Sequence, residues 1–108
     1  MKRLIDVYVY RMNSGFPEFL LLLRSKNKIY ANQWRMVGGK VKENETYWKA
    51  ALREVNEELG LKPDKFWVIP SVNTFYESSS DQVHHIPAFA AEISVQKITL
   101  DDEHTHYR

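Results

Sequence analysis

The chain has no cysteine, and only four glycines and four prolines occur among its 108 residues. The lack of cysteine excludes disulfides and thiolate chemistry, and it is typical of proteins in a reducing cytosol. The longest apolar run, residues 19–23, is far shorter than the ~20 residues of a membrane-spanning helix. Residues 1–3 lead into an alternating pattern and not into the apolar block of a signal peptide. We therefore expect a cytoplasmic protein with no membrane partner.

An excess of charge of one sign is also lacking. The 15 Lys and Arg residues nearly balance the 14 Asp and Glu residues, for a net charge of +1. Such a weak field gives no reason to expect nucleic acid as the main partner. The hydrophobic fraction of 44% is that of an ordinary globular domain, and there is no repeat or linker. The sequence predicts a single domain over residues 1–108.

Several strands are expected from alternation and turn signals. Residues 4–11 place Ile5, Val7 and Val9 on one face, and they form a predicted hairpin with residues 19–24 across the turn at residues 13–15. Further strands are expected at residues 66–69, 72–76 and 83–93, with an exposed loop at residues 77–81. With one helix among them, they predict a mixed α+β domain.

The helix is predicted over residues 46–59. Thr46 suits the N-cap, Gly60 suits a left-handed C-cap, and Pro63 prevents continuation. Apolar residues at helical spacing predict the stripe that faces the core. They are Trp48, Ala51, Leu52, Val55 and Leu59.

Three glutamates on this helix break local rules. Glu54 and Glu58 are a like-charge pair at i,i+4, which costs an isolated helix roughly 0.2–0.5 kcal/mol. Glu57 and Glu58 also lie in the last turn, where the helix dipole favours cations. Taken alone, such glutamates are more often a solvated face. The alternative is a bound divalent metal, because hard cations such as Mg²⁺ take carboxylate ligands completed by water and substrate phosphates.

The residues around the helix fit the second interpretation. Arg53 follows Glu45 by eight positions and precedes Glu57 by four, so it can pair with one or both and orient a metal ligand. Residues 38–39, a Gly-Gly pair, would let the backbone turn tightly and let metal or phosphate approach the main chain. Residues 40–44 would then loop back, and Asn44 suits a left-handed position just before Glu45.

The stretch from Gly39 to Leu61 resembles the Nudix box. It reads glycine, five residues, glutamate, seven residues, then Arg-Glu-apolar-any-Glu-Glu-any-Gly-apolar. Every specified position matches. These positions are Gly39, Glu45, Arg53, Glu54, Val55, Glu57, Glu58, Gly60 and Leu61.

The resemblance to the Nudix hydrolases implies an α/β/α sandwich around a mixed sheet, with the box as a loop–helix–loop. It implies hydrolysis of a pyrophosphate bond in a nucleoside diphosphate linked to another group, with Mg²⁺ or Mn²⁺. In the family pattern Glu54, Glu57 and Glu58 are metal ligands, joined by the main-chain carbonyl of Gly38. The pair of Arg53 and Glu45 then braces the box, together with Gly39 and Gly60.

The general base is left open between two glutamates. One is Glu54. The other is Glu103, because residues 103–107 resemble a short stretch of Nudix enzymes that act on (deoxy)nucleoside triphosphates and dihydroneopterin triphosphate. The plainer interpretation, a solvated loop acid at Glu103, carries equal weight.

The chain departs from the family pattern in three places. Val37 stands where many members have proline, and Asn44 stands where many have glycine. The helix that normally follows the last strand is missing. We therefore expect a chain truncated at its C-terminus, or a homodimer in which a partner subunit covers the bare face of the sheet.

Residues outside the box are expected to bind the substrate, by stacking on a base or contacting phosphate. Aromatics in strands are more often core residues, so the structural interpretation competes for each. One of the strand histidines, His84 and His85, could point toward the site, although a satisfied or exposed strand histidine is the commoner case. The substrate-binding candidates are Arg24, Trp34, Arg35, Lys40, Phe75 and Tyr76.

The function predicted from the sequence is hydrolysis of a (deoxy)nucleoside triphosphate or related triphosphate to monophosphate and pyrophosphate. A dinucleoside polyphosphate or nucleotide-sugar hydrolase is an alternative, because these substrates present the same pyrophosphate to the box. Another alternative is a binding module that senses a nucleotide without turning it over. The complete set of carboxylates argues against such a module.

Overall fold

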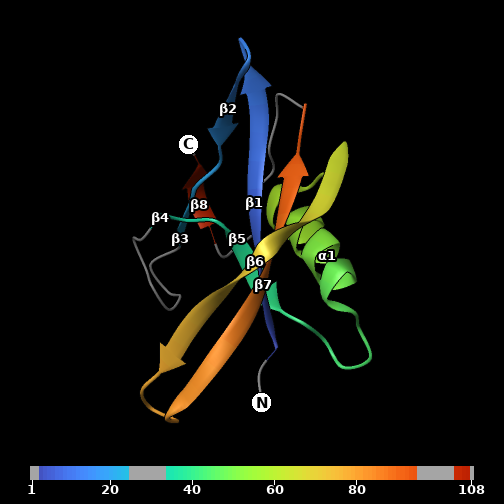
Figure 1. Cartoon of the computed structure of the whole chain (residues 1–108). Coiled ribbons are helices and arrows are strands. Elements are labelled where there is room, and N and C mark those ends of the chain that lie inside the picture. The colour runs from blue at the N-terminus through green and yellow to red at the C-terminus, as the bar shows by residue number, and fades with distance from the viewer. Residues whose placement is uncertain (1–2, 25–33, 95–103, 108) are drawn as a thin grey trace.

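The computed structural model describes residues 3–24, 34–94 and 104–107 (Figure 1). In these ranges one helix stands among eight strands. The elements are β1 (Leu4–Asn13), β2 (Phe16–Phe19), β3 (Leu22–Arg24), β4 (Trp34–Arg35), β5 (Val37–Lys40), α1 (Tyr47–Leu59), β6 (Lys65–Glu77), β7 (Gln82–Glu92) and β8 (His104–Tyr107).

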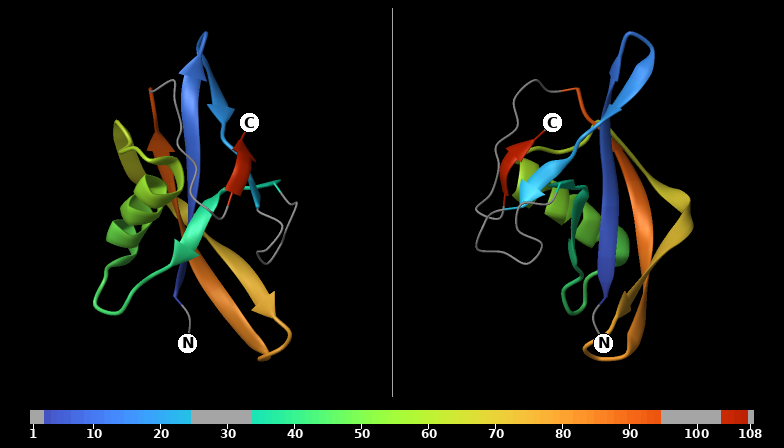
Figure 2. Two further views of the ribbon diagram at one scale, coloured as in Figure 1. Left: turned by 180° about the vertical axis from the view of Figure 1, so that it is seen from behind. Right: turned by 90° about the vertical axis from the view of Figure 1, so that its left-hand side faces the viewer.

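The strands form two sheets. The larger sheet has the order β2-β1-β7-β6, and β5 pairs with β1 as a fifth strand. It is mixed, because β1 runs parallel to β7 but antiparallel to β2 and β5. The smaller sheet has the order β4-β3-β8. In Figure 1, α1 lies to the right of β1 and the smaller sheet to its left, and the right-hand view of Figure 2 shows both on the side of β1 away from β6 and β7.

Strand β1 has the alternation that the sequence predicts. Ile5, Val7 and Val9 are buried in the core, while the residues between them are only partly buried. The predicted hairpin is only partly right, because β2 already begins at Phe16 and ends at Phe19. The chain then crosses to the smaller sheet, burying Leu20 on the way, so residues 22–24 pair with β4 and β8 instead of β1.

The two strands predicted at residues 66–69 and 72–76 are one strand, β6, with an irregularity. Its register against β7 shifts between Val68 and Val72. Pro70 lies in this interval and has no N–H to give to a ladder, which is the usual reason for a break in pairing. Beyond this irregularity β6 continues, and its second half pairs with the first half of β7.

Helix α1 starts and stops as predicted. The Thr46 hydroxyl accepts a hydrogen bond from the Lys49 N–H at 3.4 Å. Gly60 is left-handed at φ 72°, and its N–H donates to the Asn56 carbonyl at 2.8 Å. These two caps satisfy backbone groups that a helix leaves unpaired at its ends.

One predicted core residue of the helix is wrong. Trp48 is 49% exposed and lies beside the Lys49 ammonium, 5.4 Å from its ring. Leu52 is only partly buried. The buried face includes the two glutamates of the like-charge pair, so its centre is shifted away from Trp48. Its members are Ala50, Ala51, Glu54, Val55, Glu58 and Leu59.

The core lies between α1 and the larger sheet. Val55 and Leu59 of the helix belong to one buried cluster with Val7, Phe89 and Ala91 of the central strands. No helix in the described part of the chain is long and apolar enough to cross a membrane. The mixed sheet with a helix packed on it confirms the predicted fold class. The second helix layer implied by the resemblance does not occur among the described residues.

Candidate active site

Two carboxylates of the helix are buried, and one of them lies against strand β5. Glu54 is 8% exposed and Glu58 is 1% exposed. A side-chain Cβ at Gly39 would lie 2.6 Å from each carboxyl oxygen of Glu54, closer than real Cβ atoms come. Only glycine therefore leaves room at this position for the Glu54 carboxyl.

This contact corrects the predicted role of the glycine pair. Gly38 and Gly39 lie within β5, opposite Asp6 and Ile5 of β1, and neither has a positive φ. The backbone does not turn there. The close approach that requires glycine is that of a neighbouring carboxyl group, because the helix packs its glutamate directly onto the strand.

Arg53 connects the helix to the preceding loop and to β5. Its Nε and Nη2 donate to the two oxygens of Glu45 at 2.9 and 3.0 Å, in a bidentate pair. Its Nη1 donates to Glu54 at 2.7 Å and to Glu57 at 3.1 Å. Its Nη2 also donates to the Lys40 carbonyl at 2.8 Å. The predicted pairing of Arg53 with Glu45 and Glu57 is confirmed, and the guanidinium additionally fixes Glu54.

The loop before the helix is shaped to bring Glu45 to this arginine. Asn44 has φ 64°, as predicted from its left-handed tendency. The Lys42 N–H donates to Glu45 at 2.9 Å. Hydrogen bonds from Arg53, followed by the Lys42 N–H, lower the pKa of Glu45 to about 2. Glu45 is therefore ionised throughout the neutral range and holds the loop.

Burial has the opposite effect on Glu54. Desolvation raises the pKa of Glu54 above its usual value, and hydrogen bonds from Glu58 and Arg53 offset part of the rise. The same contacts raise the pKa of Arg53, mainly through its hydrogen bonds to Glu45. Two carboxyl groups in contact at a buried site repel each other when both are ionised, and Arg53 offsets this through its contact with Glu54. A divalent metal bound between the two carboxylates would reduce this repulsion.

The two buried carboxylates do not by themselves form a complete set of metal ligands. No group of three or more carboxylate or imidazole side chains in the described ranges is arranged to hold a metal ion. Glu57 has a 48% exposed side chain and is directed to Arg53. Mg²⁺ is usually bound through one or two protein carboxylates, with waters and substrate phosphates as its other ligands. Glu54 and Glu58 fit that requirement as they stand.

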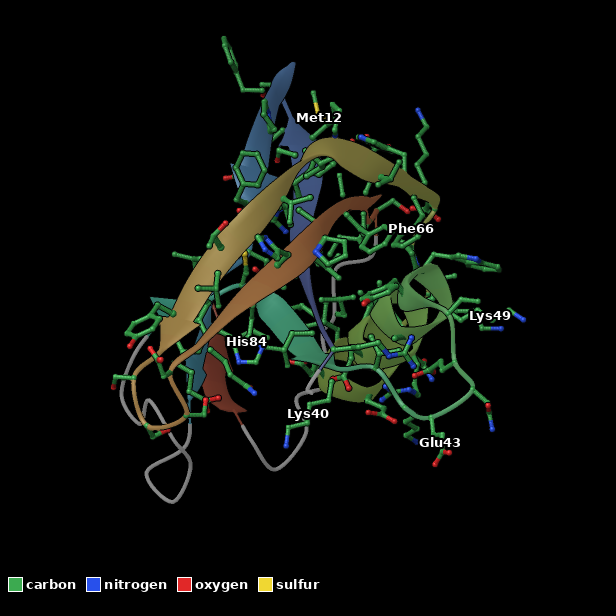
Figure 3. All side chains as sticks on the ribbon, turned by 60° about the horizontal axis from the view of Figure 1, so that its bottom comes forward. Met12, Lys40, Glu43, Lys49, Phe66 and His84 are labelled. Carbon is green, nitrogen blue, oxygen red and sulfur yellow. The ribbon has the colours of Figure 1, made fainter. Side chains whose placement is uncertain are left out.

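The predicted substrate residues are scattered in the structure. Phe75 stacks on His84, with ring centroids 5.9 Å apart. Tyr76 alternates to the other face, where its hydroxyl donates to Asp81 at 2.7 Å. Lys40 has an exposed side chain at the end of β5, and Figure 3 marks it together with His84. Only backbone positions are described for Arg24, Trp34 and Arg35, in β3 and β4, and Glu103 lies outside the described residues.

One polar cluster was missed from the sequence. The Asn73 amide donates to Asp6 at 2.9 Å and to the Tyr8 hydroxyl at 3.3 Å. Asp6 was visible as a charged residue inside an alternating strand. Its partner, however, is 67 positions away, and only the fold brings the two together.

His84 is the better placed of the two strand histidines. It is 4% exposed, while His85 is exposed. Its Nε2 lies 3.2 Å from a carboxyl oxygen of Glu77, which also accepts a hydrogen bond from Ser80. Its Nδ1 is buried and has no hydrogen-bond partner in the described part of the chain.

A separate hollow lies beside the start of the helix. A groove of about 700 Å³ lies between the start of α1 and strand β6. Its walls are mainly aromatic and apolar, and of the predicted substrate residues with described side chains, Lys40, Phe75 and Tyr76, none lines it. The groove walls are Arg3, Glu45, Thr46, Tyr47, Trp48, Phe66, Trp67, Val68 and Phe89.

The arrangement as a whole defines a class of protein. A helix carries a buried pair of carboxylates, one of which lies against a glycine of β5, and one arginine ties that carboxylate to a loop glutamate and a strand carbonyl. Such an acidic site suits a divalent cation together with a phosphate-bearing ligand. A model of the NUDIX domain matches residues 2–108, so the chain belongs to the NUDIX domain family.

Three similar proteins illustrate the family. The oxidized purine nucleoside triphosphate hydrolase of Mus musculus is 34% identical over 95 residues, which cover 79% of this chain and 61% of the relative. An RNA pyrophosphohydrolase of Francisella tularensis is 32% identical over 80 residues, covering 68% and 49%. The crystal structure of a MutT protein from Methanosarcina mazei has a TM-score of 0.78 and 31% identity, covering 98% and 75%. The chain thus spans about half to three fifths of the length of these curated relatives.

Proposed function

We propose that this chain hydrolyses a pyrophosphate bond in a nucleoside diphosphate linked to a further group. The substrate we favour is a (deoxy)nucleoside triphosphate, cleaved to monophosphate and pyrophosphate. The observation that carries the proposal is the buried contact between Glu54 and Glu58, fixed by Arg53 against β5. The named activities of the mouse and Francisella relatives support the same reaction class.

A divalent cation, Mg²⁺ or Mn²⁺, would be held by Glu54 and Glu58, with Glu57 and the Gly38 carbonyl as further ligands. When bound, it would neutralise phosphate charge and make a water more acidic. The chain itself supplies the alignment. Arg53 holds one oxygen of Glu54 at 2.7 Å, so the carboxyl keeps one orientation while its second oxygen serves the site.

One glutamate must take the proton of the attacking water. Glu54 suits this role because desolvation raises its pKa, which makes it a better proton acceptor than an exposed glutamate. Glu103 is the alternative from the sequence. In the structure, β8 pairs with β3, and His104 at its start is opposite Arg24. The two assignments differ in whether Glu103→Gln removes most of the turnover.

Other substrates of the same chemistry remain alternatives to a triphosphate. Dinucleoside polyphosphates and nucleotide sugars carry the same pyrophosphate group. The Francisella relative adds the triphosphate end of an RNA chain to this set. A binding module that senses a nucleotide without hydrolysing it is a further alternative. The Glu54–Glu58 contact argues against that module, since binding alone does not require two buried carboxyl groups in contact.

The test is a hydrolysis screen across these substrate classes with Mg²⁺ and with Mn²⁺, following phosphate and pyrophosphate release. Glu57→Gln and Glu58→Gln are the test variants. Glu43→Gln is the matched control, because Glu43 is an exposed glutamate in the same segment, residues 39–61. We expect metal-dependent turnover that both test variants lose and the control keeps. Full activity in both test variants and their double, or nucleotide binding without any turnover, would contradict the proposal.

A further inference from the structure

The face of the sheet that lies away from α1 carries a connected polar cluster. Ile5 and Val7 of β1 are buried in one cluster with Val55 and Leu59 of α1, so Asp6 and Tyr8, which alternate with them, lie on the opposite face of the strand. Asn73 reaches across from β6 and donates one amide group to both, at 2.9 and 3.3 Å. We name Asp6, Tyr8 and Asn73 the amide cluster. The amide of Asn73 fixes the direction of the Asp6 carboxyl.

Neighbouring residues of β5 contact the amide cluster and Glu54 of the helix. Gly39 faces Glu54, while its neighbour Gly38 faces Asp6, where a Cβ would lie 3.1 Å from Oδ1. Strand β5 is paired with β1 on one side only in the described part of the chain. A ligand whose phosphates lie at Glu54 can therefore pass over β5 and place its other end beside Asp6.

An aromatic pair lies next to the amide cluster on the same face. Asn73 is opposite Ile86 and Phe75 is opposite His84 in the β6–β7 ladder, so Phe75 follows Asn73 on the same side of the strand. Phe75 and His84 are stacked, and Phe75 remains 37% exposed. The exposed ring is suited to stack on a flat ligand.

The Asp6 carboxylate is the acceptor that this face offers a ligand, because an ionised carboxylate only accepts hydrogen bonds. At His84, Nε2 lies 3.2 Å from a carboxyl oxygen of Glu77, and when Nε2 carries the proton the buried Nδ1 is an acceptor as well. A buried polar atom without a partner is costly. The complementary ligand edge presents N–H donors.

We propose that Asp6, oriented by Asn73, selects an amino-bearing nucleobase by accepting its N–H hydrogen bonds. The inference rests on the proposed function, because it assigns the base-reading end of the same substrate. Asp6 is a specificity-determining residue, Asn73 is its positioning residue, and Phe75 stacks on the base. Hydrogen bonds to a charged group predict a discrimination of about 10- to 100-fold against a base that lacks the amino group.

The experiment compares dGTP with dITP, which differ only by the exocyclic amine of the base. The kcat and KM of both substrates are measured for the wild type, Asp6→Asn, Asp6→Ala and Asn73→Ala. The wild type should prefer dGTP by about 10- to 100-fold in kcat/KM, mainly through KM. Asp6→Ala should abolish the preference. Asp6→Asn should reduce it, because an amide offers one acceptor and one donor group. Circular dichroism checks that each variant is folded.

Glu18→Gln is the control, because it also removes an acidic strand residue, in an exposed ion pair with Arg11. It should keep the preference for dGTP. Equal kcat/KM values of the wild type for dGTP and dITP would overturn the inference. A preference that survives in folded Asp6→Asn and Asp6→Ala would overturn it too.

A binding measurement separates this inference from the proposed function. Calorimetric titration of dGMP and dIMP reports base recognition without turnover. Tighter binding of dGMP that Asp6→Ala abolishes would support the inference even if no nucleotide were hydrolysed. Hydrolysis with equal binding of dGMP and dIMP would overturn the inference and leave the proposed function standing.

Discussion

The two faces of strand β5 carry carboxylates that reach their places in different ways. On the helix side, Glu54 and Glu58 come from one turn of α1, and Arg53 ties Glu54 to Glu45. On the other side, Asp6 comes from β1 and is held by Asn73, 67 positions along the chain. The residues of the first site can be recognised from their spacing in a short stretch of sequence. The second exists only after the sheet has formed.

This difference separates two requirements of the proposed reaction. Any nucleoside diphosphate derivative presents the same phosphates, so the helix side can use one fixed pattern. The group attached to those phosphates varies, and the residues that read it must lie elsewhere. Adjacent glycines, Gly38 and Gly39, let both carboxylates approach the same strand from opposite faces. Variants at these positions can therefore separate turnover from selection.

The largest effect is expected from Gly39→Ala. The new Cβ would overlap the Glu54 carboxyl, which would have to move and give up its hydrogen bond to Arg53, so stability should fall as well. Moving it displaces a proposed metal ligand, so kcat should fall by about 100-fold or more. Steady-state kinetics and urea unfolding measure the two effects. Unchanged kcat would show that the position of the Glu54 carboxyl does not limit turnover.

Arg53→Lys should have the next largest effect. Lysine keeps the charge but loses the planar fork that binds Glu45 with two hydrogen bonds while also reaching Glu54. We expect turnover to fall by about 10- to 100-fold. The free energy of unfolding should fall by about 2 kcal/mol. Lys49→Arg is the control, since Lys49 is an exposed residue of the same helix. An active, fully stable Arg53→Lys would mean that charge alone suffices.

Gly38→Ala probes the other face of the same strand. Its Cβ would lie 3.1 Å from Asp6 Oδ1 and 3.1 Å from the Ile5 carbonyl, so it crowds the amide cluster and not Glu54. We expect a change of less than about tenfold in activity, seen in KM for dGTP, with kcat nearly kept. The crowded carbonyl is backbone and cannot swing away, so unfolding should become easier by about 1–3 kcal/mol. A kcat loss equal to that of Gly39→Ala would remove the distinction between the faces.

The smallest effect is a dependence of stability on pH that comes from Glu45. Its folded pKa is about 2, below the usual 4.5, because Arg53 and the Lys42 N–H stabilise the carboxylate. Between these values the unfolded chain binds a proton that the folded chain does not, so stability falls as the pH is lowered. The contribution is complete above about pH 5 and is lost as the pH approaches about 2.

Urea midpoints between pH 6 and pH 3 measure this contribution. Glu45→Gln should be less stable at pH 6 and should have a shallower decline than the wild type, while exposed Glu43→Gln should follow the wild type. Parallel curves for Glu45→Gln and the wild type would show that the ion pair with Arg53 does not stabilise the fold.

The parts of the fold that were predictable are those set by short-range pattern. Strand β1 and helix α1 were found because alternation and the two caps, Thr46 and Gly60, act over a few residues. Trp48 was misassigned because buried glutamates move the buried face of the helix, which hydrophobicity alone does not reveal. Pro70 falls at a register shift of one strand, where the sequence suggested two strands.

The site divides in the same way. The contacts of Arg53 with Glu45 and Glu57 followed from spacing, whereas its hydrogen bond to the Lys40 carbonyl depends on how β5 passes the helix. The contact of Asp6 with Asn73 depends on the strand order of the sheet, which no local pattern encodes. The metal-binding roles of the glutamates, a role for Glu103 as the base, a homodimer and a cytoplasmic location stay predictions.

The central claim is that Glu54 and Glu58 form the divalent-cation site of a nucleotide pyrophosphohydrolase. Titration of the protein with Mn²⁺, followed by electron paramagnetic resonance of the free ion, tests it without requiring turnover. Binding should be displaced by Mg²⁺, weakened at least about tenfold in Glu54→Gln and in Glu58→Gln, and kept in Glu43→Gln. Equal Mn²⁺ affinity in the wild type and in both site variants would contradict the claim.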